Sequence, residues 1–404
     1  MDRREFLTSM LAVSSLGLAA CADGRSHQGG GRPNSRAQGE QPDGATRRGA
    51  ASGGSAGGAT TTAPAPDRPK LGPRQLAGQR VIFSYAGLSV PKSLLDQVES
   101  GQAGGVIFFK QNIESDAQIK AAIAQLRTAQ QHSPVPHPLL LMTDQEGGLV
   151  RRLPGPPAWS EKQIGASSNP TGEASQAGRR AGNNLAGVGM NLNLAPVLDV
   201  YYKPGNFIDQ YGRSYSDKAS VVSECGQAMI SAQQRVKVAA TGKHFPGLGS
   251  AATNQNTDEE PVTLTVSASE LRSKDEVPYD AAIKAGLDLV MCSWAVYPSL
   301  DAKHPAGLSE TIVQGELRQR HKFGGVTITD AIEAGALESW GSYGQRAVTA
   351  AGVGMDLVLC SAQSVSEGLD ALDALESALT GDKLDPGRFN RAVDRITHLR
   401  SKLA

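Results

Sequence analysis

The chain has 404 residues, and its 40 Lys and Arg balance its 40 Asp and Glu, so the formal net charge is zero. A neutral chain lacks the basic field that gathers nucleic acid, so we expect no nucleic-acid partner. The four cysteines, Cys21, Cys225, Cys292 and Cys360, are too few and too scattered for a disulfide scaffold or a cysteine-held metal site.

The first 21 residues have the composition of an export signal. An arginine pair precedes a short apolar stretch, residues 7–20, which is too short for a comfortable membrane span. The stretch ends in Leu18-Ala19-Ala20-Cys21, which resembles the cleavage site of bacterial lipoproteins, and the arginine pair resembles a twin-arginine signal. We therefore expect a signal peptide over 1–20, a lipid on Cys21, and a protein attached to the outer face of the cell membrane.

The segment that follows contains nothing that could form a hydrophobic core. Residues 22–70 include no Leu, Ile, Val, Met, Phe, Tyr or Trp, while Gly, Ala, Ser, Thr, Pro and Arg dominate. Such a composition favours a disordered linker. A basic arm that binds the cell wall is the alternative, but acidic residues are interspersed among its arginines. We expect the linker to cover 21–71 and a single folded domain to cover 72–404.

Eight short apolar segments recur along this domain, and most intervals between them are long enough for a helix. The segments are 81–85, 105–109, 139–143, 190–195, 239–243, 287–292, 326–329 and 356–360. Helical patterns occupy intervals such as 117–130, 174–187, 220–235 and 310–320. This alternation predicts an α/β fold, a (β/α)8 TIM barrel. A doubly wound open sheet is disfavoured, because no Gly-x-Gly-x-x-Gly follows the first strand.

Polar side chains follow several of the predicted strands, at the end of a barrel where active sites lie. They include acids, one histidine and strong cations, which suit a polar, hydroxyl-rich ligand better than an apolar one. In chain order they are Asn112, Asp144, Glu146, Arg152, Asp199, Arg213, Lys243, His244 and Asp330.

Five of these strand-end segments form a specific set of motifs. They are 144–153 (DQEGGLVRRL), 191–200 (NLNLAPVLDV), 212–214 (GRS), 243–247 (KHFPG) and 328–330 (ITD). Together, and in this order, they resemble glycoside hydrolase family 3. More narrowly, the chain is similar to the single-domain β-N-acetylhexosaminidase branch of that family, bacterial enzymes that remove N-acetylglucosamine from cell-wall fragments. The resemblance covers roughly residue 73 to the C-terminus.

The resemblance implies a role for several residues. Asp330 matches the family's carboxylate nucleophile, which attacks the anomeric carbon and gives a covalent glycosyl-enzyme and retention of configuration. Asp144 matches the acceptor of sugar hydroxyls, whereas Glu146 is expected to be structural. The groups that match donors to the same sugar ring are Arg152, Arg213, Lys243 and His244.

The chain departs from the family pattern in the loop after the fifth strand. The hexosaminidase branch carries there an Asp-Ser-His or similar triplet, whose histidine is the general acid/base. Here the matching residues are 254–256 (NQN) or, with a two-residue insertion, 256–258 (NTD), and the loop contains no histidine. A carboxylic acid with a raised pKa can transfer the same proton, so Asp258 is the candidate acid/base, with Glu259 and Glu260 nearby.

A second departure follows the sixth strand, where many relatives carry a histidine and this chain has Trp294. The indole is expected either to stack on a sugar or to pack in the rim of the barrel. Cys292 and Cys360 end strands that are not neighbours, so we expect buried thiols and no disulfide.

These expectations lead to one main function and two alternatives. The main prediction is a retaining β-N-acetylglucosaminidase that acts on peptidoglycan fragments or related amino sugars, works without a cofactor or metal, and is a monomer. The first alternative is a weakly active or inactive sugar-binding lipoprotein of the same fold, because the usual acid/base is missing. The second is a β-glucosidase or a phosphorolytic variant, because the altered loop shapes both the leaving group and the incoming nucleophile.

Overall fold

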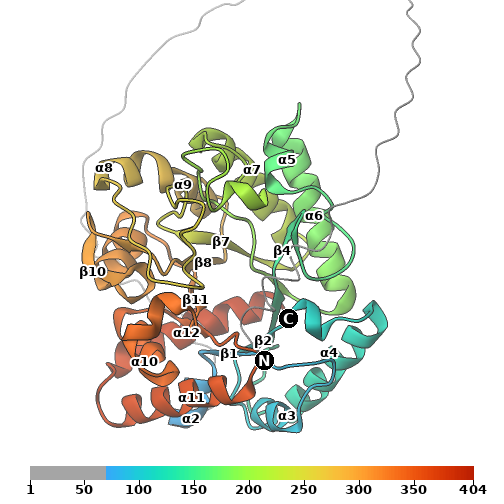
Figure 1. Cartoon of the computed structure of the whole chain (residues 1–404). Coiled ribbons are helices and arrows are strands. Elements are labelled where there is room, and N and C mark those ends of the chain that lie inside the picture. Colours follow the sequence, from blue (N-terminus) through green and yellow to red (C-terminus); the bar gives the residue numbers. More distant parts are fainter. Residues whose placement is uncertain (1–69) are drawn as a thin grey trace, which may run out of the picture. The chain divides into compact units, whose positions relative to one another are not determined.

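Eight parallel strands close into a barrel in residues 70–404, the part of the chain that the computed structural model describes. In order around the barrel they are β1 (Val81–Phe83), β2 (Gly105–Ile107), β3 (Leu140–Thr143), β6 (Leu192–Asn193), β7 (Ala239–Phe245), β8 (Leu289–Cys292), β11 (Val326–Ala331) and β12 (Leu357–Leu359). Strand β1 pairs with both β2 and β12, so the first and the last strand are neighbours and the sheet is closed (Figure 1). Each predicted apolar segment overlaps one barrel strand, and the (β/α)8 prediction is confirmed.

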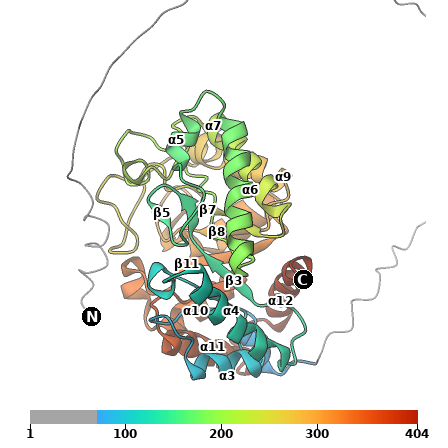
Figure 2. The same cartoon turned by 90° about the vertical axis from the view of Figure 1, so that its right-hand side faces the viewer.

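Helices surround these strands, as α6, α7 and α9 do along one side of the barrel (Figure 2). The α-helices are α2 (Pro73–Gly78), α3 (Lys92–Glu99), α4 (Asp116–Gln131), α5 (Glu161–Gly165), α6 (Pro170–Val188), α7 (Ala219–Gln234), α8 (Ala268–Glu270), α9 (Val277–Lys284), α10 (Tyr343–Val353), α11 (Val365–Thr380) and α12 (Pro386–Lys402). The predicted helix at 310–320 is present as a π-helix, η5 (Thr311–Arg320), and η3 (Leu271–Asp275) is of the same type. Short 3₁₀ turns are η1 (Lys110–Asn112), η2 (Asp209–Tyr211), η4 (Ala306–Leu308) and η6 (Gly335–Trp340). Within these residues no helix is both long and apolar enough to cross a membrane.

Helix α4 shows how the local sequence sets these elements. The hydroxyl of Ser115 accepts a hydrogen bond from the Gln118 N–H (3.2 Å), which satisfies one of the free donors at the start of the helix. Its buried residues stand three, four, seven and ten positions after Ile119 and form one apolar face with it: Ala122, Ile123, Leu126 and Ala129. The helix therefore begins at a polar cap and packs one face against the rest of the barrel.

Helix α12 closes the amino-terminal end of the barrel. Its Ile396 and Leu399 pack with the buried side chains of the barrel strands, such as Ile82 and Leu140. From the same helix, the buried Arg400 donates hydrogen bonds to the carbonyls of residues 137 and 138, which precede β3. A functional site is therefore expected at the other end of the barrel, where the carboxyl ends of the strands lie.

A buried ion cluster lies at this closed end, around Asp356 at the start of β12. Its carboxylate accepts hydrogen bonds from Arg318 (2.7 Å), Arg395 (2.6 Å) and the Thr327 N–H (2.9 Å), and the side chain is fully buried. The cluster joins η5, β11, β12 and α12, so it ties the last helix to the barrel.

Replacing Asp356 with Asn is expected to lower the free energy of unfolding by about 3–5 kcal/mol, because two arginines would be left without their buried partner. Urea unfolding followed by circular dichroism measures the change. The matched control is Asp373→Asn, which removes a solvent-exposed partner of Arg74 and should change stability by less than about 1 kcal/mol. Equal effects of the two substitutions would contradict the expectation.

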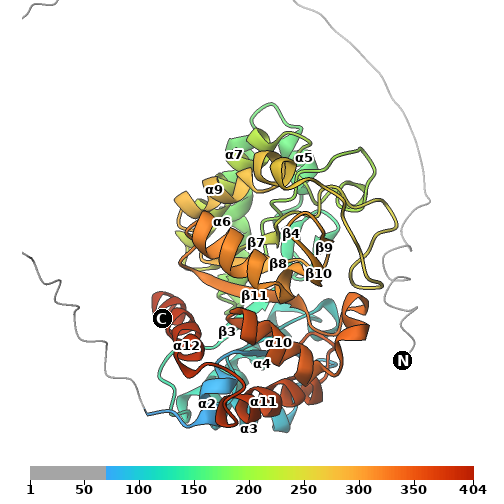
Figure 3. The ribbon, with the colours of Figure 1, turned by 90° about the vertical axis from the view of Figure 1, so that its left-hand side faces the viewer.

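The opposite end of the barrel carries the long connections. Two hairpins form there: β4 (Gln145–Gly147) with β5 (Val150–Arg151) after β3, and β9 (Val296–Tyr297) with β10 (Asp301–Pro305) after β8. Figure 3 shows the hairpin β9–β10 and the long loops after β6 and β7 on one side of the barrel. These segments surround the carboxyl ends of the strands, where the predicted site residues lie.

Candidate active site

A buried lysine at the carboxyl end of β7 is the centre of the site. Lys243 is 2% exposed, and its Nζ donates to Oδ1 of Asp144 (2.8 Å) and lies 2.7 Å from Oε1 of Glu146. Burial alone would lower the lysine pKa, but the two carboxylates outweigh it and the pKa is raised. Lys243 is therefore a fixed positive charge at neutral pH.

Glu146 joins this lysine to an arginine from the loop after β6. The Arg213 guanidinium donates through Nε (3.0 Å) and Nη2 (2.9 Å) to the two carboxylate oxygens of Glu146. Burial opposes the carboxylate charge, yet Arg213 and Lys243 hold the pKa of Glu146 down at about 2. Both oxygens of Glu146 are occupied by cations, which supports the structural role expected for it.

Asp144 and Arg152 are less completely paired. The Nε of Arg152 lies 3.9 Å from Oδ2 of Asp144, and it has no hydrogen-bond partner among residues 70–404. Burial opposes the Asp144 charge, but Lys243 and Arg152 outweigh it and its pKa is lowered. The Asp144 carboxylate can accept a hydrogen bond from a sugar hydroxyl, and Nε of Arg152 can donate one. The two groups therefore suit recognition of a sugar hydroxyl.

His244 is held by Asp199 from the segment after β6. The Asp199 carboxylate accepts from Nδ1 of the ring (2.8 Å), and its other oxygen accepts from the N–H groups of His244 (3.2 Å) and Leu248 (2.7 Å). Since a carboxylate only accepts, the ring proton lies on Nδ1, and Nε2 faces Nη2 of Arg213 at 3.4 Å. Asp199 therefore sets both the tautomer and the direction of His244.

The predicted nucleophile, Asp330, is partly exposed near the end of β11. Its Oδ1 accepts a hydrogen bond from the N–H of Ala331 (2.8 Å), which fixes the carboxylate at the strand end. The carbonyl of Ala331 in turn accepts from the indole N–H of Trp294 (2.8 Å). This hydrogen bond from Trp294 stabilises the end of β11, the strand that carries Asp330.

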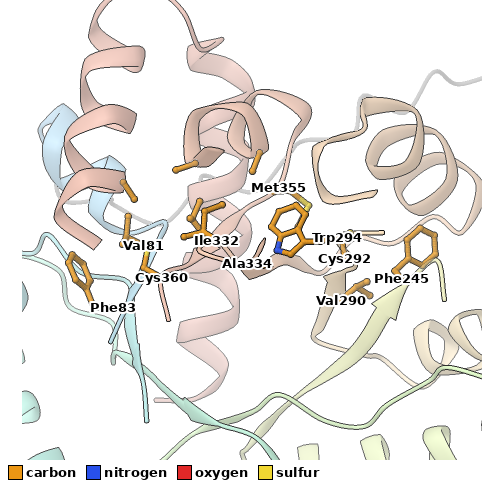
Figure 4. Close-up of a cluster of buried hydrophobic side chains, with 14 of the residues drawn as sticks. Val81, Phe83, Phe245, Val290, Cys292, Trp294, Ile332, Ala334, Met355 and Cys360 are labelled. Carbon is orange, nitrogen blue, oxygen red and sulfur yellow. The ribbon is translucent and has the colours of Figure 1, made fainter. Parts of the chain in front are cut away.

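Trp294 itself is a packing residue. It is 1% exposed and belongs to the hydrophobic cluster of Figure 4, together with Cys292 and Ile332. Of the two expectations for this indole, packing is correct, and stacking on a sugar is excluded by its burial. Cys292 and Cys360 are both buried free thiols, as predicted.

Asp258 lies on the long loop after β7, and this loop is attached to the segment that follows Asp330. The carbonyl of Asp258 accepts a hydrogen bond from the N–H of Gly335 (2.9 Å), and the carbonyl of Thr257 accepts from that of Ala336 (3.1 Å). The backbone of Asp258, the candidate acid/base, is thereby fixed to the segment that follows the predicted nucleophile Asp330.

The electrostatic environment of Asp258 favours the protonated form of its carboxyl group. The side chain of Asp258 is exposed in the site, but the surrounding protein removes part of its solvation, and Asp330 and Glu333 add negative charge. These effects raise its pKa to about 7, although Arg213 and His244 oppose the rise. A carboxylic acid whose pKa is raised toward neutral pH can serve as a general acid/base.

No metal centre accompanies these groups in the described part of the chain. Within residues 70–404, no three His, Cys, Asp or Glu side chains are arranged to hold a metal ion. The absence of a cofactor remains a prediction.

Residues 82–399 match the glycosyl hydrolase family 3 N-terminal domain. The chain belongs to glycosyl hydrolase family 3. A protein of Arthroderma benhamiae named as an uncharacterized secreted glycosyl hydrolase is 47% identical over 330 residues, which are 81% of this chain and 93% of that protein. A β-hexosaminidase of Xanthomonas axonopodis pv. citri is 32% identical over 302 residues, 72% of this chain and 86% of the relative.

A solved family 3 structure has the same fold. The β-N-acetylglucosaminidase from a Paenibacillus species superposes with a TM-score of 0.78 at 31% sequence identity. The match covers 82% of this chain and 63% of that protein, so this chain spans less than two thirds of the Paenibacillus enzyme. With the sequence relatives, this likeness makes the chain a β-hexosaminidase-like glycoside hydrolase.

The family 3 barrel brings the five predicted sugar-binding residues into one network through Glu146. Lys243 contacts Asp144 directly, Arg213 faces His244, and Arg152 lies beside Asp144. The predicted lipid-bearing Cys21 lies outside the described residues.

Two contributions to the family 3 site were missed from the sequence. In the sequence, Asp199 is only one of several polar strand-end residues, and nothing in its position indicates that it orients His244. Glu333 follows Asp330 by three residues and interacts with Asp258, and no motif in the sequence indicated that role.

The contact between the Asp258 loop and the nucleophile segment requires glycine at position 335. A Cβ atom on Gly335 would lie 2.1 Å from the carbonyl oxygen of Glu259, so the loop would have to move. We expect Gly335→Ala to lower kcat/KM for substrates with poor leaving groups by about 10- to 100-fold, because small displacements of a catalytic group are costly.

The matched control for this substitution is Gly187→Ala, at a helical position where an added Cβ would meet nothing within 4 Å. Its kinetic constants should equal those of the unaltered enzyme. Unchanged turnover in Gly335→Ala would show that the attachment of the loop does not matter for catalysis.

Proposed function

We propose that this protein is an exported, retaining β-N-acetylglucosaminidase that acts on peptidoglycan fragments or related amino sugars. Asp330 is the nucleophile and Asp258 is the general acid/base. The observation that carries the proposal is the hydrogen bond from the N–H of Gly335 to the carbonyl of Asp258 (2.9 Å), which attaches the Asp258 loop to the segment that follows Asp330. The raised pKa of Asp258 agrees with the role of a general acid/base. Retaining hydrolysis needs two carboxyl groups, one as the nucleophile and one as the general acid/base.

The reaction follows from this arrangement in two steps. Asp258 gives its proton to the oxygen of the leaving group while the Asp330 carboxylate attacks the anomeric carbon, which breaks the glycosidic bond and forms a glycosyl-enzyme. The ionised Asp258 then takes a proton from water, and the resulting hydroxide displaces Asp330 with a second inversion. The sugar is released with its original configuration, and both carboxyl groups return to their starting states.

The ring is oriented by the charged network beneath it. Asp144 accepts hydrogen bonds from sugar hydroxyls, and three donors contact the same ring: Arg152, Arg213 and Lys243. His244, whose ring proton is bound to Asp199, offers Nε2 as an acceptor. Charge-assisted hydrogen bonds hold the anomeric carbon at a fixed place relative to the nucleophile. Relatives named as β-hexosaminidase and β-N-acetylglucosaminidase support an amino sugar as substrate.

The cellular setting of the proposal comes from the amino terminus. The Leu18-Ala19-Ala20-Cys21 sequence supports lipid attachment at Cys21 and a position at the outer face of the cell membrane, where cell-wall fragments are found. We propose that the protein acts there as a monomer, with residues 21–71 as the linker between the lipid and the barrel.

A rapid-mixing time course with an aryl N-acetyl-β-glucosaminide tests the proposal. The good leaving group departs with little help from an acid, so this substrate reports on the nucleophile. We expect sustained turnover, release of the β-anomer first, and no effect of inorganic phosphate.

Other outcomes of this assay point to other functions. Release of one equivalent followed by a stall would mean that the base for water is inefficient. A glycosyl phosphate product would identify a phosphorolytic enzyme. Bound sugar without release would indicate a sugar-binding lipoprotein and contradict the proposal.

A further inference from the structure

A groove outside the active site runs along the outer wall of the barrel, between α10 and α11. The two helices lie side by side (Figures 1 and 3), and a Cβ atom on Gly344 would lie 2.7 Å from the Cβ of Ala374, so they approach each other closely where both residues line the groove. The groove has a volume of about 660 Å³, which is typical of ligand sites. None of the residues assigned to catalysis or to sugar binding lines it.

An indole stands at one end of this groove. Trp340, the last residue of η6, is half-buried and lines the groove. The imidazole of His304 packs against the indole, with 5.5 Å between the ring centroids. His304 is itself held in place, because Oδ2 of Asp301 accepts hydrogen bonds from its Nδ1 (2.9 Å) and from the hydroxyl of Ser309 (2.7 Å). The hairpin β9–β10 therefore holds Trp340 in a fixed position.

Hydrogen-bond donors line the groove beyond the indole. The Ser342 hydroxyl accepts from the N–H of Gln345 (3.3 Å), and Oε1 of Gln345 accepts from the N–H of Ser342 (2.8 Å). These contacts leave the hydroxyl proton of Ser342 and the side-chain NH₂ of Gln345 without a partner in residues 70–404. The hydroxyl of Ser377 and the ammonium of Lys383, which also line the groove, have no partner there either. Since no Asp or Glu lines the groove, it suits a ligand rich in acceptor oxygens.

These features together match a carbohydrate chain better than other ligands. A sugar ring presents a C–H face, which packs on an aromatic ring, and a rim of hydroxyl and acetamido oxygens, which accept hydrogen bonds. A purely apolar ligand would remove the free donors from water without pairing them, which is unfavourable. A metal ion would find no carboxylate in the groove. The charge of Lys383 complements a carboxylate, so the groove favours an acidic glycan.

The groove begins beside the segment that holds the Asp258 loop. In η6, the N–H groups of Gly335 and Ala336 bind the carbonyls of Asp258 and Thr257, and Trp340 ends the same element. From there the groove follows α10 and α11 toward the segment that precedes α12, the helix that closes the base of the barrel. It therefore leads away from the active end of the barrel along the outer wall.

We propose that this groove is a second carbohydrate site, which binds a segment of an acidic cell-wall glycan apart from the sugar that is cleaved. Trp340 stacks on a sugar ring, Ser342, Gln345 and Ser377 donate to its oxygens, and Lys383 binds a carboxylate of the glycan. The proposal takes its class of ligand from the proposed function. Two sites on one polymer raise the effective concentration of the chain at the active site.

Binding to the groove is tested with the whole protein as the Asp330→Asn variant, so that the probe is not cleaved. The probe is a soluble tetrasaccharide of alternating N-acetylglucosamine and N-acetylmuramic acid, and binding is measured by titration calorimetry. We expect two sites, and the affinity of one should fall at least about tenfold when Ser377→Glu places a negative charge in the groove. The matched control is Ser366→Glu, the same change at an exposed serine of α11 that does not line the groove, and it should alter neither site.

Turnover separates failure of this proposal from failure of the proposed function. With Asp330 intact, Ser377→Glu should hydrolyse a small aryl N-acetyl-β-glucosaminide like the unaltered enzyme, but should release less N-acetylglucosamine from insoluble peptidoglycan, by about 3- to 10-fold. A single tetrasaccharide site with the same affinity in Ser377→Glu and Ser366→Glu would overturn the groove as a carbohydrate site and leave the proposed function standing. Groove binding that Ser377→Glu removes, in a protein that cleaves neither substrate, would contradict the proposed function and support the groove.

Discussion

Asp330→Asn should lower kcat for an aryl N-acetyl-β-glucosaminide by at least about a thousandfold, because the amide cannot form the glycosyl-enzyme. Sugar binding should persist, since the charged network around Lys243 does not involve Asp330 in its hydrogen bonds. Steady-state kinetics and calorimetric binding of N-acetylglucosamine measure the two properties. Asp373→Asn, a change at an exposed carboxylate of α11, serves as the control and should leave both unchanged.

Trapping the intermediate tests the same role independently of the substitution. A fluorinated amino sugar with a good leaving group should form a glycosyl-enzyme that hydrolyses slowly. Mass spectrometry should then find one added sugar on the peptide that contains Asp330. A label on another residue would contradict the assignment of the nucleophile, and the absence of any adduct would indicate a mechanism assisted by the substrate's own acetamido group.

Asp258→Asn should affect substrates according to their leaving groups. For an unactivated disaccharide, loss of the proton donor should lower kcat/KM by about 10²–10⁴-fold, whereas formation of the glycosyl-enzyme from an aryl substrate should change little. Added azide should restore turnover of the aryl substrate and give the β-glycosyl azide, because a small anion needs no base. Glu260→Gln, two residues away on the same loop, is the matched control and should behave like the unaltered enzyme.

The pH dependence gives a second signature of Asp258. Its pKa is raised to about 7, so the protonated form is present below that pH and is lost as the pH rises through it. Turnover of the disaccharide should therefore decline above about pH 7 in the unaltered enzyme. An identical decline in Asp258→Asn would show that a different group supplies the proton.

The barrel was predictable because its signals are local. Buried parallel strands appear as short apolar runs, and each of the eight runs overlaps one strand. The position of the site followed as well, since Asp144, Lys243 and Asp330 stand at the ends of their strands and a closed barrel brings those ends together. Here the order of segments along the chain already determines which residues meet.

The remaining parts of the site depend on contacts that no local pattern encodes. Asp258 was chosen only as the first titratable residue near the missing histidine, and its environment is set by backbone hydrogen bonds to Gly335 and Ala336. Glu333 binds Ser361, which lies 28 positions along the chain and after another strand. Trp294 was equally compatible with stacking and packing, and only its burial decides between them.

The pairing of β1 with β12, and the closure of the barrel base by α12, have a consequence for synthesis of the protein. The first strand begins at Val81, but its neighbour on one side ends at Leu359 and the helix that covers the base extends to Lys402. A nascent chain on the ribosome therefore cannot complete the ring of hydrogen bonds until the residues up to Leu359 have emerged. Contacts this distant in sequence are formed slowly, and during that interval the apolar lining of the incomplete barrel is open to other chains and to chaperones.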